Sequence, residues 1–166
     1  MFLEPTTLTS AALVMTETVE QQYGIETKPL LEKLGLDPAL MDKPGARYPT
    51  AKMRELWSSL AQATGDPCVG LTIGARVKTT SFHALGFAWL ASSSILEELQ
   101  RLQRYFKVIS SVPLDIRLLD TGTTYRFEIR ASEGDQQSPP EAIDAFFMAI
   151  VRLCRLTRDN HFSPTH

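Results

Sequence analysis

Apolar side chains recur at helical spacing through the first two thirds of the chain. Between Thr50 and Thr64, Met53, Leu56 and Leu60 fall on one stripe, with Trp57 beside them. A period of about 3.6 residues is typical of an amphipathic helix with one buried face. Comparable stripes predict helices at residues 10–22, shortly after residue 27, and at 66–77, 82–90 and 94–109.

The segment at residues 82–90 differs from the others because it is almost wholly apolar. A helix without a polar face is normally covered on most sides, so we expect this one to be buried. The next helix begins with Ser94 and Glu97, which have the spacing of a capping box. Glu97 and Arg101 stand about one turn apart, which predicts an ion pair on the solvated side of that helix.

The period changes from helix to strand at Pro113. Apolar residues alternate with polar ones at 114–118 and 125–129, and a turn motif at 120–123 separates the two segments. This pattern predicts a β-hairpin. Because two strands alone are marginal in water, we expect a further strand, with residues 162–166 as its approach.

Ser138-Pro139-Pro140-Glu141 again has capping-box spacing, with proline at the first helical position. This motif predicts a helix that continues through Cys154. The order of elements predicts an α+β fold, mainly α: a helical bundle of about six helices, then a small antiparallel sheet and a long C-terminal helix. We expect one domain at residues 1–166, helical over 1–112 and hairpin plus helix over 113–166.

The composition points to a globular domain without direct DNA contact. The 166 residues are 43% hydrophobic with a net charge of -2, so the chain has no general attraction to phosphate backbones. It lacks both a long apolar run and the order of a signal peptide, from which we expect a cytoplasmic protein without membrane contact. Cys68 and Cys154 lie far apart among apolar residues, which favours two buried thiols over a disulfide.

His83 is where an enzyme or metal site would be sought first, because the other two histidines lie near the C-terminus. No Asp, Glu or Cys cluster at ligand spacing accompanies it. A structural role, contact with a ligand, and haem or metal ligation are its three interpretations. The serines at 92–94 fit a helix cap better than a nucleophile. Gly70, Gly74 and Gly86 lack phosphate-loop spacing and indicate close helix packing.

Two basic stripes recur at helical spacing, and because the chain is acidic we interpret them as solvated faces rather than anion or DNA contacts. They consist of Arg101, Arg104 and Lys107, and of Arg152, Arg155 and Arg158.

Aromatic residues are numerous enough to form a small-molecule pocket, which is usually apolar with a few placed polar groups. Core packing also explains each aromatic residue taken singly. We expect the pocket between the helices at 82–90 and 94–110 and the sheet. The candidate ligand-binding residues are His83, Phe82, Phe87, Trp89, Tyr105, Arg130 and Phe146. We expect no catalytic residue, cofactor or metal ion.

Several helix starts and turns fall in a recognisable order between residues 23 and 105. The motifs are Leu34-Gly35-Leu36, Asp37-Pro38-Ala39-Leu40, Tyr48-Pro49, Thr64-Gly65-Asp66-Pro67, Gly70-Leu71-Thr72-Ile73-Gly74, Leu85-Gly86-Phe87 and Ser92-Ser93-Ser94-Ile95-Leu96-Glu97-Glu98-Leu99. This order resembles the N-terminal effector-binding domain, of the arabinose-binding type, of AraC/XylS-family transcriptional regulators. Specifically, it is similar to the type found in ornithine-utilisation regulators. The chain departs from the family at Ser94-Ile95, where relatives commonly have Pro-Thr.

The resemblance implies a domain that binds a small-molecule effector and dimerises, attached to a C-terminal helix-turn-helix part that reads DNA. This sequence lacks that part, so DNA contact is expected only through it. The best candidate for a homodimer surface is the apolar stripe at residues 142–156, which missing C-terminal strands could equally bury. A small enzyme or a haem-based sensor that uses His83 in an apolar pocket is the alternative function.

Overall fold

The computed structural model describes residues 4–131 and 138–165. It is mainly helical with two small antiparallel sheets, which confirms the α+β class. The helices are α1 (Thr9–Tyr23), α2 (Lys28–Lys33), α3 (Thr50–Thr64), α4 (Val69–Gly74), α5 (His83–Leu90), α6 (Ile95–Ile109) and α7 (Pro140–Thr157). The 3-10 helices η1 (Pro38–Leu40) and η2 (Thr79–Phe82) and the strands β1 (Thr6–Leu8), β2 (Arg47–Pro49), β3 (Leu114–Asp120) and β4 (Tyr125–Ala131) complete the described elements.

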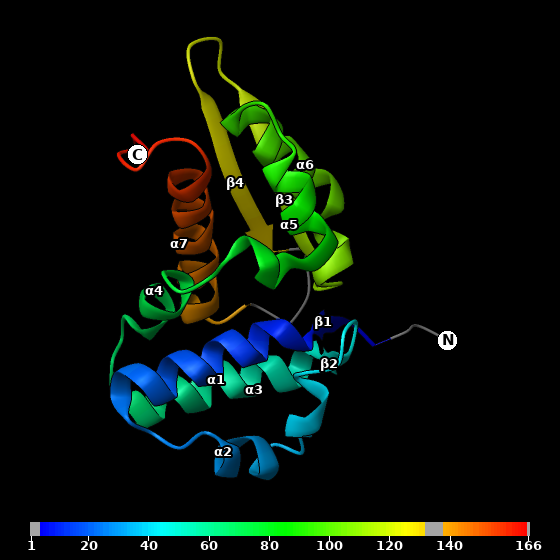
Figure 1. Cartoon of the computed structure of the whole chain (residues 1–166), viewed down its shortest axis with the longest axis vertical. Coiled ribbons are helices and arrows are strands. Elements are labelled where there is room, and N and C mark those ends of the chain that lie inside the picture. Colours follow the sequence, from blue (N-terminus) through cyan, green and yellow to red (C-terminus); the bar gives the residue numbers. More distant parts are fainter. Residues whose placement is uncertain (1–3, 132–137, 166) are drawn as a thin grey trace.

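The molecule has two halves, each with its own apolar core (Figure 1). The first core lies between α1, α2, α3 and α4 and includes Met15, Leu56 and Ile73. The second lies between α5, α6, the β3–β4 hairpin and α7 and includes Trp89 and Leu153. The site described below lies where these two halves meet.

α4 and α7 make the closest helix contact between the halves. Gly70 of α4 lies against the backbone of Glu141, and Gly74 lies against the backbone of Ala145. A Cβ atom at either glycine would overlap these atoms, so only glycine allows the helices to approach so closely. The prediction that these glycines serve close packing is confirmed.

Two short strands, absent from the sequence prediction, join residues 6–8 to the end of α6. β1 pairs with β2 in an antiparallel register that places Thr7 opposite Tyr48. The guanidinium of Arg47 donates to the carbonyl oxygens of Val108 and Ile109 at 3.0 and 3.1 Å. These carbonyls belong to the last turn of α6, which has no helical partner for them. Strands of three residues are too short to display alternation, which is why the sequence pattern did not reveal them.

Several predicted boundaries and caps need correction. α4 ends at Gly74 rather than at residue 77. Ser94 caps α6 as predicted, accepting a hydrogen bond from the Glu97 amide at 3.2 Å, but the Glu97 carboxylate accepts from the amide of Ser93 instead of Ser94. α7 begins after Pro139 without a side-chain cap, so the predicted Ser138 capping box does not form. The proline geometry alone starts this helix.

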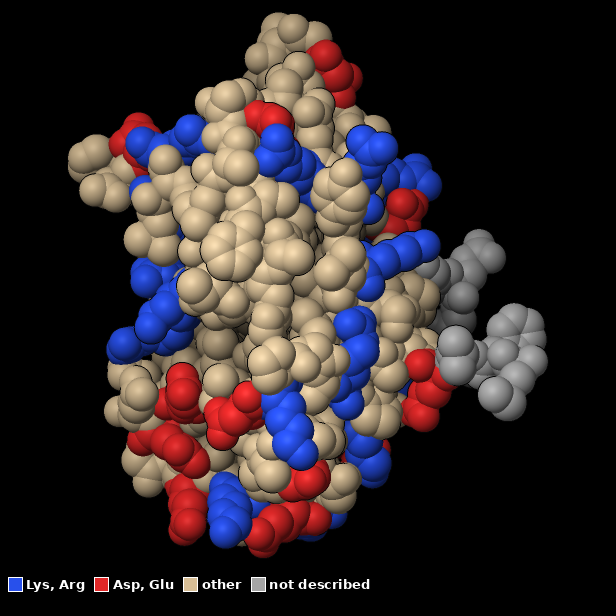
Figure 2. Space-filling model, turned by 45° about the vertical axis from the view of Figure 1, so that its right-hand side comes forward, with Lys and Arg blue, Asp and Glu red and all other residues tan. Residues whose placement is uncertain are grey.

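α5 is not buried all round, contrary to the prediction from its apolar composition. Leu85 and Trp89 enter the second core, whereas Phe87 is 70% exposed and Leu90 is 54% exposed. Figure 2, which brings the side of α5 and α6 forward, shows a broad uncharged area over the upper half and mixed charges over the lower half. With eight residues, α5 is only about two turns long and lies at the edge of its half, which leaves one face without cover.

The prediction of two buried thiols is confirmed for Cys154 and wrong for Cys68. Cys154 is buried in the second core, where desolvation raises the pKa of its thiol to about 12. Cys68 is exposed, because it lies in the turn before α4, where its amide donates to the Asp66 carboxylate at 2.8 Å. Both thiols are free.

The hairpin forms as predicted, in a register that pairs Leu114 with Ala131 and Asp120 with Tyr125. Residues 162–165 form no strand, so the expected approach to a further strand is not seen in the described part, and residue 166 lies outside it. Helices cover the hairpin instead: Phe127 meets Phe147 of α7 edge to face, with ring centroids 6.2 Å apart.

Among residues 4–131 and 138–165, no helix is both long enough and apolar enough to cross a membrane.

Candidate functional site

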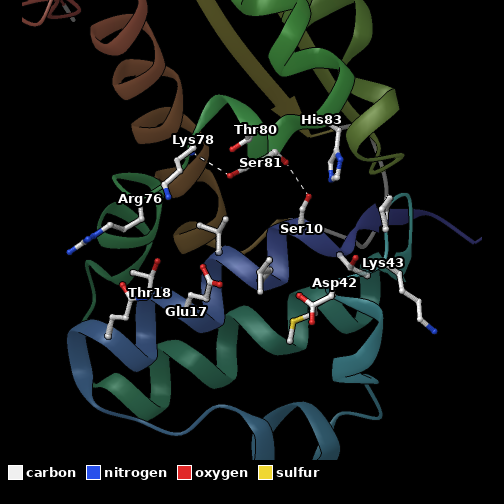
Figure 3. A pocket seen from close by; sticks show the side chains of 16 residues that line it. Ser10, Glu17, Thr18, Asp42, Lys43, Arg76, Lys78, Thr80, Ser81 and His83 are labelled. Carbon is white, nitrogen blue, oxygen red and sulfur yellow. Dashed lines mark hydrogen bonds between the residues drawn. The ribbon is translucent and has the colours of Figure 1, made fainter.

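A polar groove of about 460 Å³ lies between the two halves (Figure 3). α1 and the loop after η1 form its lower wall, and the segment from residue 76 to the start of α5 forms its upper wall. Its ionisable side chains are Glu17, Asp42, Lys43, Arg76, Lys78 and His83. We call it the polar groove.

Charges of both signs face the polar groove. Figure 3 shows Glu17 and Asp42 on the lower wall and Lys78 and His83 on the upper wall, whereas the charged ends of Lys43 and Arg76 point away. Among the residues that the structure describes, none of the five charged side chains forms an ion pair. Two carboxylates and one ammonium group are therefore free to interact with a molecule in the groove.

Apolar side chains separate these charges. Leu13 and Val14 of α1 and Met41 and Pro44 of the opposite loop also line the groove. A ligand with a short hydrocarbon chain between charged ends would find apolar surface for the chain.

His83 lies at a strained point of the backbone. Its φ is 48° and its ψ is -125°, and it is the one non-glycine residue with positive φ in the described part of the chain. Such a conformation costs on the order of 1–3 kcal/mol and is often found at functional sites. The strain arises where η2 turns sharply into α5, with Gly86 against the backbone of Thr79. The sharp turn places the imidazole in the groove (Figure 3).

A second hollow, of about 200 Å³, lies beside the polar groove. Side chains of both cores line it, including Met53 and Ile73 from the first and Phe106 and Ile109 from the second. Trp57, Phe82 and Phe146 add aromatic rings, and its one charged side chain among the described residues is Arg54. We call this hollow the apolar cavity.

The structure does not bring the seven predicted ligand-binding residues together. His83 lines the polar groove, and Phe82 and Phe146 line the apolar cavity. Trp89 is 1% exposed in the second core, and its indole N–H lies 3.4 Å from the Thr157 hydroxyl. The other three lie outside both hollows: Phe87 and Tyr105 are exposed, and Arg130 pairs with Glu128 on the surface of β4. Whether any of the seven contacts a ligand stays a prediction.

Sequence reasoning missed the charged residues of both hollows. Glu17 and Arg54 are ordinary charged residues of α1 and α3, and Asp42 and Lys78 lie in connecting segments. No short motif links these positions, since the groove is assembled from segments far apart in the chain. The one usable signal was His83, which is the residue that the sequence singled out.

The basic stripe on α7 is not a free solvated face, contrary to its interpretation from the sequence. Arg152 donates to the carbonyl of Val77 at 2.9 Å, and Arg155 donates to that of Phe162 at 2.8 Å. Arg158 pairs with the buried carboxylate of Glu98 at 2.9 Å. The stripe holds α7 against neighbouring segments.

Glu98 and Arg158 form a clasp at the end of α7. Glu98 is fully buried on α6, and its Oε1 also accepts a hydrogen bond from Thr157 at 3.0 Å. Arg158 additionally donates to the carbonyl of Ser92. Desolvation raises the pKa of Glu98, and the contacts with Thr157 and Arg158 oppose this shift. In the described part of the chain, Oε2 of Glu98 has no hydrogen-bond partner.

No group of three or more His, Cys, Asp or Glu side chains in the described residues is arranged to hold a metal ion. Small-molecule sites in proteins often lie in hollows of this kind, at the junction of two units of a fold.

Comparison with known proteins identifies the class as transcription regulators. The chain belongs to the family described as the arabinose-binding domain of AraC transcription regulator, N-term, which it matches over residues 24–166. The ornithine utilization regulator of Pseudomonas aeruginosa is 28% identical over 113 residues, which cover 68% of this chain and 32% of that protein. Uncharacterized HTH-type transcriptional regulators of Mycobacterium bovis and Mycobacterium tuberculosis are 30% identical over 118 residues, or 69% of this chain and 33% of each relative.

The chain thus spans about a third of the length of these relatives. The matches confirm the resemblance to AraC-type regulators, and they are to regulators and not to enzymes.

Proposed function

We propose that this chain is the effector-sensing domain of an AraC-type transcription regulator, and that the effector binds in the polar groove. The observation that carries the proposal is the set of free charges on both walls: Glu17 and Asp42 below, and Lys78 with His83 above. Charged groups that face a shared hollow without internal partners are well placed to bind a ligand of matching charge.

The charges favour a diamino carboxylic acid as the effector. Glu17, Asp42 and Lys78 together carry a net charge of -1 when His83 is neutral. A ligand with two ammonium groups and one carboxylate carries a net charge of +1 and offers each of the three side chains an opposite partner. Ornithine has this chemistry, and the Pseudomonas relative is named for its utilization. Leu13 and Met41 would cover the methylene chain between the charged ends.

Effector binding would alter the balance between arrangements of the two halves. The lower wall belongs to the first half, and the upper wall leads into the second (Figure 1). A ligand that binds one arrangement better than another shifts the population by its difference in affinity, and a coupling of about 1–3 kcal/mol is typical. A DNA-binding part attached to this domain would respond to this shift. We place the protein in the cytoplasm, where a transcription regulator meets DNA.

Homodimer formation is a further part of the proposal, but α7 offers less surface for it than its sequence indicates. Leu153, Cys154 and Ile150 are buried within the chain, whereas Phe147 and Leu156 stay exposed. A weak dimer through this face predicts that Phe147→Asp lowers the sedimentation coefficient at high protein concentration. A variant that sediments like the unchanged chain at every concentration would remove α7 as the dimer surface.

Thermal unfolding with a matched set of ligands tests the groove. We expect L-ornithine to raise Tm, since a ligand at 100 times its Kd stabilises the native state by about 2.7 kcal/mol. Putrescine, which lacks the carboxylate, and 5-aminopentanoate, which lacks the α-amino group, should raise Tm less. Lys78→Gln should abolish the preference of the protein for ornithine over putrescine.

The doubly substituted chain Glu17→Gln/Asp42→Asn should lose the ornithine response. The exposed Glu26, which does not line the groove, supplies the matched control Glu26→Gln, which should keep it. If none of the three ligands changes Tm at millimolar concentration, or if the double variant responds like the control, the polar groove is not the effector site.

A further inference from the structure

The apolar cavity lies directly across a wall from the polar groove. Ser10 and Val14 of α1 and Ser81 of η2 line both hollows, so the contact between α1 and η2 separates them. Ser10 donates to the carbonyl of Ser81 at 3.1 Å across this contact. The cavity is therefore a distinct space, with its own walls and its own chemistry.

The apolar cavity is an open hollow with room for a small ring. An enclosed apolar cavity of about 150 Å³ is already large enough to bind benzene. This one measures about 200 Å³ and lies where the two cores meet without filling the space between them. Phe106 and Phe146 stand edge to face on one side, with centroids 5.4 Å apart. Such a site suits hydrocarbon, and aromatic hydrocarbon in particular.

Among the residues that the structure describes, Arg54 is the single charged group that lines the cavity. It also lies at the outer face of α3 beside Leu34 and Ser58, which places it at the mouth of the cavity. Its neighbours Lys52 and Glu55 pair with each other at 3.1 Å. Within residues 4–131 and 138–165, the guanidinium of Arg54 makes no ion pair. A guanidinium in this position is suited to bind a carboxylate through two parallel hydrogen bonds.

The hydroxyl groups around the cavity are mostly occupied by protein partners. Thr7 and Ser110 bond to each other at 2.7 Å, and Thr50 donates to the carbonyl of Pro5 at 3.1 Å. A ligand with many polar groups would find few partners here and would lose their hydration. The favourable occupant has one anionic end and is otherwise apolar.

We propose that the apolar cavity is a second ligand site, which binds a small apolar monocarboxylate. The carboxylate would lie on Arg54, and the hydrocarbon would lie between Met53, Phe106 and Phe146. This site is independent of the proposed effector site, because the polar groove favours a ligand with several charged groups and the apolar cavity favours a ligand that is apolar except at one end.

Isothermal titration of the full chain with 4-phenylbutyrate, and with the uncharged 4-phenylbutan-1-ol, tests the proposal. We expect the acid to bind at least tenfold more tightly than the alcohol. Arg54→Gln should remove this difference, and the matched control Lys52→Gln should keep it. Ala11→Leu, which places extra volume in the cavity, should weaken both ligands. Binding of the acid should change the fluorescence of Trp57, and Trp57→Phe should abolish that change.

Two results would overturn the proposal. One is equal binding of acid and alcohol by the unchanged chain, or no binding of either. The other is an affinity for the acid that survives Arg54→Gln but falls with Lys78→Gln, which would place the anion in the polar groove. Glu17→Gln/Asp42→Asn should leave phenylbutyrate binding unchanged, so a failure of the proposed effector site and a failure of this one give different patterns.

Discussion

Replacing Arg158 by methionine should destabilise the domain strongly at neutral pH. The substitution removes the guanidinium that lies 2.9 Å from the buried Glu98 and leaves Thr157 as the one remaining partner of that carboxylate in the described structure. Removing one member of a buried ion pair typically costs about 3–5 kcal/mol. The side chain of Arg158 is 28% exposed, so water can partly replace it, and we expect about 3 kcal/mol near pH 7.

The loss of folding stability caused by Arg158→Met should become smaller as the pH falls. The pKa of Glu98 in the folded chain is raised from its ordinary value of 4.5, chiefly by desolvation, and losing Arg158 would raise it further. A raised folded-state pKa means that the folded state holds the proton more tightly, so this contribution to stability is full below pH 4.5 and is lost as pH rises through the folded pKa. Near pH 4, Glu98 of the variant is neutral, and the remaining loss is the hydrogen bond to Ser92, about 1–2 kcal/mol.

Urea unfolding followed by circular dichroism at pH 7 and pH 4 measures both values. Arg155→Met is the matched control on the same helix, because Arg155 bonds to an uncharged carbonyl, and its effect should not depend on pH. Adding Glu98→Gln to Arg158→Met should recover about 1 kcal/mol at pH 7, because no unpaired charge stays buried. A loss below about 0.5 kcal/mol at pH 7, or a larger loss at pH 4 than at pH 7, would refute the reasoning.

Four further substitutions separate packing, strain and exposure. Gly74→Ala should cost about 1–3 kcal/mol, because the new methyl group overlaps the backbone of α7; an unchanged Tm would mean that the helices can move apart freely. His83→Gly should raise the urea midpoint, with a net gain of about 1 kcal/mol from the relieved positive φ, and a lower midpoint would show that the imidazole holds the turn. Trp89→Ala should cost about 3–5 kcal/mol while Phe87→Ser on the same helix stays within about 0.5 kcal/mol; comparable losses would contradict the exposure of Phe87.

The sequence predicted those elements whose pattern is local. The bounds of α3 follow from its stripe and the glycine after it, and α6 follows from the Ser94 cap and its amphipathic face. The hairpin follows from alternation alone. The burial of α5 could not be predicted in this way, because composition does not say whether a short helix lies inside a half or at its edge. The exposure of Cys68 could not be predicted either, because this residue has apolar sequence neighbours but lies in a surface turn.

The candidate sites depend on tertiary placement still more strongly. In the sequence, Glu17 and Lys78 are ordinary charged residues. They face a shared groove only because the fold places α1 opposite η2. His83 could be singled out because histidines are few, yet its strained φ comes from the turn between η2 and α5, which no sequence pattern signalled. Nothing in the sequence distinguishes Arg54 from other charged residues, and it lines a cavity only because the two cores meet beside it.

α5 connects the groove to the end of α7. His83, at its first turn, faces the groove, and the carbonyl of Ala88, near its other end, accepts a hydrogen bond from Arg101 of α6. Two residues after α5, the carbonyl of Ser92 accepts from Arg158 at the end of α7. A two-turn helix is stiff over its length of about 12 Å, so a displacement of His83 by a ligand cannot be absorbed within α5. The displacement must be taken up either in the strained turn between η2 and α5 or in the clasp of Glu98 and Arg158. This clasp holds the end of α7, the last helix before the C-terminus of the chain.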